Sequence, residues 1–74
     1  MARVFRKALM QQWITENHKE DMVDDSVREM MDKLDGQEAT ESCWDRVVKG
    51  NPVLWCTGKD GVGTYVREEW CRFE

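Results

Sequence analysis

The side chains best suited to nucleophilic or metal chemistry in this 74-residue chain are three cysteines and one histidine. Cys43, Cys56 and Cys71 are thirteen and fifteen residues apart, and no Cys-x-x-Cys pair is present. Zinc sites favour closely spaced ligand pairs, and nucleophilic catalysis needs a base and an orienting group beside the thiol. We therefore predict no enzyme activity, no bound metal and no cofactor, with reduced thiols that pack as small hydrophobic groups. A metal site made of the three cysteines and His18 is the alternative.

A glycine-rich loop, residues 58–63, is the second candidate for chemistry. Its sequence, Gly-Lys-Asp-Gly-Val-Gly, has the composition of a phosphate-binding loop. Such a loop follows a strand and opens a helix, and its lysine comes after the last glycine. Here the lysine comes early and a strand-like segment follows, so we interpret the loop as the tip of a β-hairpin.

Acidic side chains are the third candidate, and they are concentrated in the middle of the chain. Residues 16–45 carry eleven carboxylates against three basic side chains, whereas residues 1–15 carry a net charge of +3 and residues 46–74 a net charge of +1. An acidic surface repels phosphate and attracts basic surfaces. The predicted partner-binding residues are Glu20, Asp21, Asp24, Asp25, Asp32 and Asp35, together with Trp70. Alternatively, the aspartates at the start of the second predicted helix only stabilise that helix end.

Apolar residues at helical spacing predict three helices ahead of the hairpin. The first covers residues 3–16, and the second ends at Gly36, a residue type that suits the left-handed conformation after a helix. The second helix starts either at Asp21 or at a capping box that begins with Ser26. A short third helix is expected at residues 40–49, before a proline that stops it.

Two runs rich in β-branched and aromatic residues, 53–57 and 64–68, predict the two strands of the hairpin. The Asp-Gly pair between them favours a type I′ turn, which needs a positive φ at both central residues. A turn centred on that pair places Trp55 opposite Val66, with both side chains directed towards the helices.

Large apolar side chains are candidates for the core and for a contact surface. The four tryptophans are spread along the chain: Trp13, Trp44, Trp55 and Trp70. We expect most of them in the core, with Trp70 as the best candidate for an exposed interface anchor, because tryptophan is enriched in binding hot spots. Met22 and the Met30-Met31 pair could form an adaptable contact surface or pack in the core.

From residue 26 to residue 69, the order of the predicted elements resembles the winged helix-turn-helix superfamily. The resemblance implies a recognition helix at residues 40–49 and a wing at residues 58–63, which in DNA-binding members contact DNA. The residues that it would assign to DNA contact are Thr40, Glu41, Ser42, Asp45, Arg46, Lys49 and Lys59. This set has a net charge of only +1, whereas phosphate contacts need a clustered basic face.

We therefore expect one small α+β domain over residues 1–74, with three helices followed by a C-terminal β-hairpin in winged-helix-like order. No apolar run approaches the ~18 residues that span a bilayer and no signal peptide is evident, so we expect a cytoplasmic protein without membrane contact. The predicted function is that of an acidic, non-enzymatic protein, monomeric or homodimeric, that docks on a protein partner with a basic surface. Its composition is similar to that of phage-encoded inhibitors of nucleic-acid enzymes. The alternative is a winged-helix regulator that binds DNA through residues 40–49 and 58–63.

Overall fold

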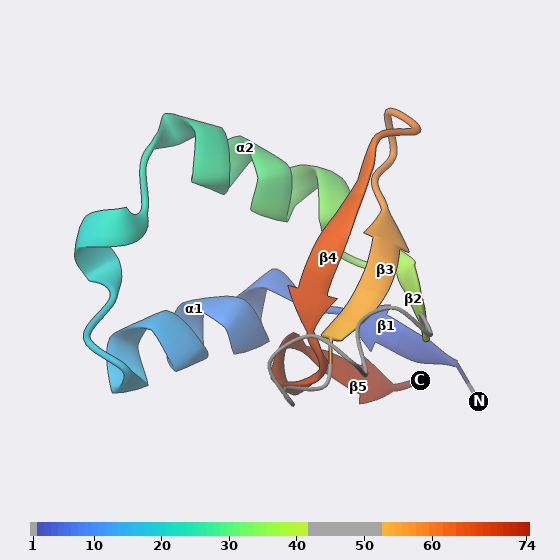
Figure 1. The fold of residues 1–74 in the computed structure, drawn as a ribbon, viewed down its shortest axis with the longest axis horizontal. Coiled ribbons are helices and arrows are strands. Elements are labelled where there is room, and N and C mark those ends of the chain that lie inside the picture. Colours follow the sequence, from blue (N-terminus) through green and yellow to red (C-terminus); the bar gives the residue numbers. More distant parts are fainter. Residues whose placement is uncertain (1, 42–52) are drawn as a thin grey trace.

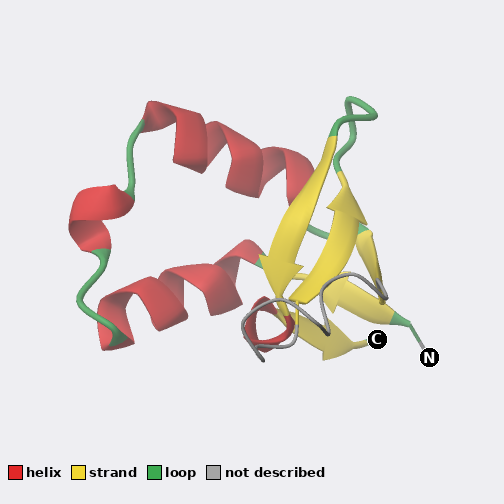
Figure 2. Ribbon diagram, in the orientation of Figure 1, coloured by secondary structure: helices red, strands yellow, loops and turns green. Residues whose placement is uncertain are grey.

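The computed structural model describes residues 2–41 and 53–74, which form two helices beside a five-stranded sheet (Figure 1, Figure 2). The helices are α1 (Lys7–Glu16) and α2 (Asp25–Leu34), and a 3-10 turn, η1 (Glu20–Met22), lies between them. The strands are β1 (Arg3–Phe5), β2 (Glu38–Glu41), β3 (Val53–Thr57), β4 (Gly63–Arg67) and β5 (Cys71–Phe73). A second 3-10 turn, η2 (Glu68–Trp70), connects β4 to β5.

The chain is therefore α+β, but the predicted order of three helices followed by a C-terminal hairpin is wrong. The predicted first helix starts too early, because residues 3–5 form β1, which pairs with β2 and β5. The predicted third helix at 40–49 is contradicted at its start, where Thr40 pairs with Trp55 in the sheet, and its remaining residues from 42 lie outside the described part of the chain. In both places, pairing between distant segments outweighs local helical preference. The element order behind the winged-helix resemblance is thus not the order that the structure has.

The sheet is curled. Its strand order is β4-β3-β2-β1-β5, and every neighbouring pair is antiparallel. In a flat sheet the two edge strands would lie about 19 Å apart, which is four strand spacings of about 4.8 Å. Yet the three residues of η2, which advance only about 6 Å in a 3-10 turn, connect β4 to β5. The sheet must therefore bend until its edges approach each other at that end, which leaves less strand edge open than in a flat sheet.

The hydrophobic core lies between the inner face of this sheet and one side of each helix. The sheet contributes Phe5, Ala39, Leu54, Cys56 and Val66. The helices contribute Met10, Ile14, Met31 and Leu34. The segment α1–η1–α2, which we call the helical arm, lies between β1 and β2 in the sequence. Because β1 and β2 are hydrogen-bonded neighbours, the helical arm leaves the sheet and returns to it at adjacent positions.

The β3–β4 hairpin is confirmed, but its predicted turn is wrong. The Gly61 N–H donates to the Gly58 carbonyl at 3.0 Å, and within this loop only Gly61 has a positive φ, +85°. The turn is therefore centred on Lys59 and Asp60, and Gly61 takes the left-handed conformation at the last position of a three-residue loop. In addition, an Asp60 carboxylate oxygen accepts a hydrogen bond from the Val62 N–H at 3.1 Å, a local bond typical of aspartate in turns.

The change of turn shifts the hairpin register by one residue. Trp55 pairs with Tyr65, instead of with Val66 as predicted. A slip of one residue exchanges the two faces of a strand. Trp55 consequently lies on the outer face with 39% of its surface exposed, while Val66 is fully buried in the core.

The extent of α2 is close to its prediction, although both predicted N-terminal caps are wrong. Asp24, rather than Asp21 or Ser26, caps the helix, because its side chain accepts a hydrogen bond from the Val27 N–H at 2.9 Å. Gly36 has a φ of +80° just beyond the helix, as predicted. Among the described residues, neither α1 nor α2 has the length and apolar character that crossing a bilayer requires.

Candidate functional site

The six acidic residues predicted to bind a partner lie in three places along the chain. Asp32 and Asp35 lie at the C-terminal end of α2, and Asp24 and Asp25 lie at its N-terminal end. Glu20 and Asp21 lie in η1. The three pairs differ in what they contact, and the contacts decide which carboxylates are available to a partner.

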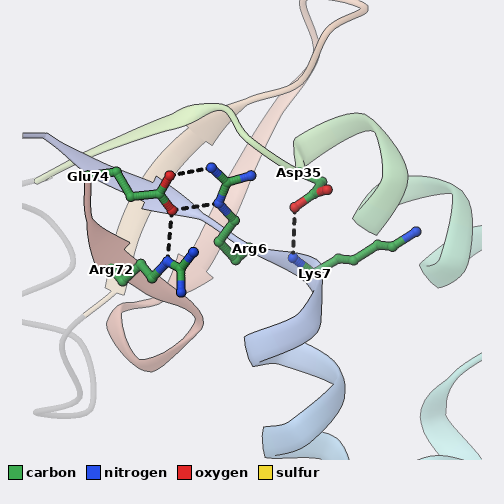
Figure 3. A network of polar contacts seen from close by, with 5 residues as sticks. All are labelled: Arg6, Lys7, Asp35, Arg72 and Glu74. Atoms are coloured by element: carbon green, nitrogen blue, oxygen red, sulfur yellow. Dashed lines mark hydrogen bonds and ion pairs between the residues drawn. The ribbon is translucent and has the colours of Figure 1, made fainter.

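Asp32 and Asp35 are held by Lys7, the first residue of α1. The Lys7 ammonium lies 2.7 Å from an Asp32 carboxylate oxygen, and the Lys7 backbone N–H donates to Asp35 at 3.1 Å, as Figure 3 shows for the second bond. The hydrogen bond to Asp32, reinforced by its charge, raises the pKa of Lys7. Asp35 satisfies one of the backbone donors that the start of a helix leaves free. These two carboxylates therefore join the two helices.

Asp24 and Asp25 begin α2, where negative charge is favoured by the helix dipole. The Asp24 side chain is the helix cap, and Asp25 lies 2.9 Å from the Arg28 guanidinium one turn later. Both aspartates are exposed. An ion pair at such a surface contributes about 0–1 kcal/mol, so Asp25 can exchange Arg28 for a cationic group of a partner at little cost.

Glu20 and Asp21 are the least engaged of the six. Both are exposed in η1, and within the described part of the chain their carboxylates receive no hydrogen bond or ion pair. Figure 1 shows that η1 lies at the end of the helical arm farthest from the sheet. We call the carboxylates of residues 16–25 the acidic tip; its members are Glu16, Glu20, Asp21, Asp24 and Asp25. With Lys19 as the one lysine among them, residues 16–25 carry a net charge of −4, which equals that of the whole chain.

An apolar groove opens between α1, η1 and α2, next to the acidic tip. Its volume is about 180 Å³. Three methionines and two tryptophans contribute much of its lining: Met10, Met22, Met30, Trp13 and Trp70. Lys19 is the one charged side chain among the described residues that line it.

Two of the methionines that line the groove, Met22 and Met30, were predicted from the sequence either to form a contact surface or to pack in the core. Met22 is 63% exposed and Met30 is half-buried, so both are accessible from the groove. Met31 instead belongs to the buried core. The groove itself could not be read from the sequence, because it depends on how far α1 and α2 diverge.

Trp70, the predicted exposed anchor, lies at the edge of the core. Its ring centroid is 5.4 Å from that of Trp13 and 6.4 Å from that of Phe5, with the rings edge to face in both pairs. The Arg67 guanidinium carbon lies over the Trp13 ring, 5.0 Å from the ring centroid. The Trp70 indole N–H has no hydrogen-bond acceptor in the described part of the molecule. Trp70 therefore forms a wall of the groove, and the most exposed of the described tryptophans is Trp55.

The residues that the DNA-binding alternative requires are not presented by a helix where the structure describes them. Thr40 is exposed in β2, and Lys59 lies at the tip of the β3–β4 hairpin. Glu41 is the last residue of β2. The other residues predicted to contact DNA lie outside the described part of the chain: Ser42, Asp45, Arg46 and Lys49.

The two described cysteines are poorly suited to nucleophilic chemistry. Burial raises the pKa of the Cys56 thiol, and burial is also the main cause that raises the pKa of Cys71 to about 11. Both thiols are therefore protonated near neutral pH, whereas a nucleophilic cysteine requires a lowered pKa. In residues 2–41 and 53–74, no three histidine, cysteine or acidic side chains form a group that could hold a metal ion.

Comparison of the chain with models of protein families, with curated proteins and with solved structures finds no match. The candidate site is therefore defined by geometry and charge: an acidic tip at the end of the helical arm, with an apolar groove beside it.

Proposed function

We propose that this chain is a small, non-enzymatic binding protein that docks on a basic surface of a macromolecular partner through its acidic tip. The observation that carries the proposal is the placement of charge, with a net −4 in residues 16–25 at the end of the arm far from the sheet. Asp32 and Asp35, which are held by Lys7, contribute to the fold instead. The raised pKa values of the two described thiols support a role that does not depend on thiolate chemistry.

Charge at this position promotes binding mainly through the rate of association. A cluster of one sign steers a partner of opposite sign and can raise its association rate by about ten- to a thousandfold. The effect weakens with salt, because the Debye length is only about 8 Å at physiological ionic strength. Enzymes that handle nucleic acids present basic surfaces to phosphate, so an inhibitor of such an enzyme, of the type that phages encode, is the role that fits this charge best.

Two single substitutions with the same effect on net charge test the proposal. Asp21→Lys changes the acidic tip, and Glu38→Lys changes an exposed carboxylate on β2 by the same two charge units. Each tagged variant and the original chain would be used to capture proteins from a lysate at low and high salt, followed by mass spectrometry and measurement of association rates with the identified partner. We expect basic proteins that are released by high salt, an association rate about tenfold lower for Asp21→Lys, and little change for Glu38→Lys.

Equal effects of the two substitutions would show that only net charge matters and would contradict docking through the acidic tip.

A gel shift with generic duplex DNA tests the DNA-binding alternative. Binding of DNA at low salt, lost steeply as salt rises, would favour the DNA-binding alternative over this proposal.

A further inference from the structure

The groove between α1, η1 and α2 has the size of a side-chain pocket. Its volume of about 180 Å³ is below the roughly 300–1,000 Å³ that is usual for small-molecule and cofactor sites. Apart from Lys19, its lining offers few polar groups that could orient such a ligand. One or two apolar side chains of another macromolecule are therefore its most suitable occupant.

The lining is also adaptable. Met10, Met22 and Met30 contribute flexible thioether side chains, and Trp13 supplies a flat aromatic wall. Methionine adapts its shape to different partners and makes favourable contacts with aromatic rings. Met22 forms an exposed lip of the groove, so covering it would remove apolar surface from water.

The groove and the acidic tip share one segment of the chain. Met22 and Val23 line the groove, while Asp21 and Asp24, their direct neighbours in sequence, carry negative charge. A partner held over this segment would thus meet an apolar pocket and a cluster of carboxylates together. Basic amphipathic helices combine these two requirements, with cationic residues beside apolar residues that project from one face.

We propose that the groove receives the apolar face of a basic amphipathic segment of the partner, while the acidic tip contacts the cationic residues of that segment. This inference depends on the proposed function and specifies the chemistry of the partner. Lys19 opposes such a partner by charge repulsion, so Lys19→Gln should strengthen the binding of a basic segment.

Methyl-labelled methionine makes the test specific to the groove. The full chain with 13C-labelled methionine methyl groups would be titrated by NMR with a synthetic helical peptide of lysine and leucine. We expect the signals of Met10, Met22 and Met30 to shift, while that of Met31, which belongs to the core, stays in place. Two control peptides accompany it: one in which glutamate replaces lysine, and one in which serine replaces leucine.

Matched variants test the contribution of the groove to affinity. Met22→Gln keeps the length of the side chain and removes its apolar character, and we expect it to weaken binding of the lysine-leucine peptide about tenfold. Val62→Thr makes the same kind of change at an apolar residue, 68% exposed, on the β3–β4 loop, and should leave the affinity unchanged.

The outcomes separate this inference from the proposed function. The two peptides that contain lysine are the lysine-leucine peptide and the one in which serine replaces leucine. If these two bind with equal affinity and the signals of the groove methionines do not shift, the acidic tip binds cations but the groove takes no part. That result overturns the inference alone. If neither lysine peptide binds, both proposals fail. Binding of the glutamate peptide, or methionine shifts that depend only on protein concentration, would assign the groove to an acidic partner or a second copy of the chain and would also overturn the inference.

Discussion

At the scale of single residues, Asp24 has two roles. Its charge belongs to the acidic tip, and its side chain caps α2 by accepting a hydrogen bond from the Val27 N–H. A change at Asp24 therefore alters both charge and helix stability, whereas Asp21 carries the same charge without a capping bond. For this reason Asp21 is the better residue at which to test binding.

The capping role itself predicts a measurable loss of stability. Replacing Asp24 with alanine leaves a backbone donor at the start of α2 without its partner, which should cost about 0.5–2 kcal/mol. Asp21→Ala removes the same charge and should remain within about 0.5 kcal/mol of the original chain. Urea denaturation of the two variants measures the difference, and equal stability would show that the cap contributes nothing.

Glu74 provides a prediction about pH. It accepts hydrogen bonds from Arg6 Nε at 2.6 Å and Arg72 Nε at 2.9 Å (Figure 3), and these bonds, with that to Arg6 the strongest, lower its pKa from 4.5 to about 2. Because the folded form has the lower pKa, the carboxylate stabilises the fold fully above about pH 4.5, and this contribution is lost as the pH falls towards 2. The difference in stability between the original chain and Glu74→Gln should therefore shrink over this range. If an NMR titration of the Glu74 side-chain carboxyl group has a midpoint near 4.5, the predicted lowering of its pKa is wrong.

At the scale of elements, the β3–β4 hairpin depends on two glycines for different reasons. Gly61 takes a left-handed backbone conformation in the turn, with open space around it. Gly63 instead leaves room for the indole of Trp55, because a Cβ at this position would overlap the ring. An aromatic ring that covers a strand glycine in this way helps to fix the register.

These two roles predict different consequences of alanine. Gly61→Ala should cost about 1–2 kcal/mol through backbone strain alone and leave the environment of Trp55 unchanged. Gly63→Ala should cost about 1–3 kcal/mol and displace the Trp55 ring. The indole N–H signal of Trp55 in an NMR spectrum distinguishes the two cases, and the prediction fails if that signal moves equally in both variants.

The sequence also predicted the elements unequally, for physical reasons. The extent of α2 and the existence of the hairpin depend on local patterns, so they were accessible. The short strands β1 and β2 pair with segments far away in the chain, and nothing local marks them as strands. The same limit applies to the candidate site: composition reveals the acidic block, but not that Lys7 binds Asp32, which is twenty-five residues away.

At the scale of the whole molecule, stability depends on a small core centred on few large side chains. Phe5 is completely buried in β1 and packs against Trp70. Phe5→Ala should cost about 3–5 kcal/mol. A chain of this length has a total stability of only about 4–11 kcal/mol, so we expect a large loss of folded protein. Circular dichroism with thermal unfolding measures it, with the exposed Val62→Ala as a control that should change stability by less than about 0.5 kcal/mol.

The position of β1 has a consequence for how the protein is made. This strand pairs with β2, about thirty-five residues later, and with β5, about seventy residues later. At a synthesis rate of about 5–20 residues per second, several seconds separate the emergence of β1 from the ribosome and that of its second partner. Until β5 is available to pair with β1, Phe5 lacks its complete packing environment, so this interval is one in which a molecular chaperone can bind the exposed apolar residues of β1.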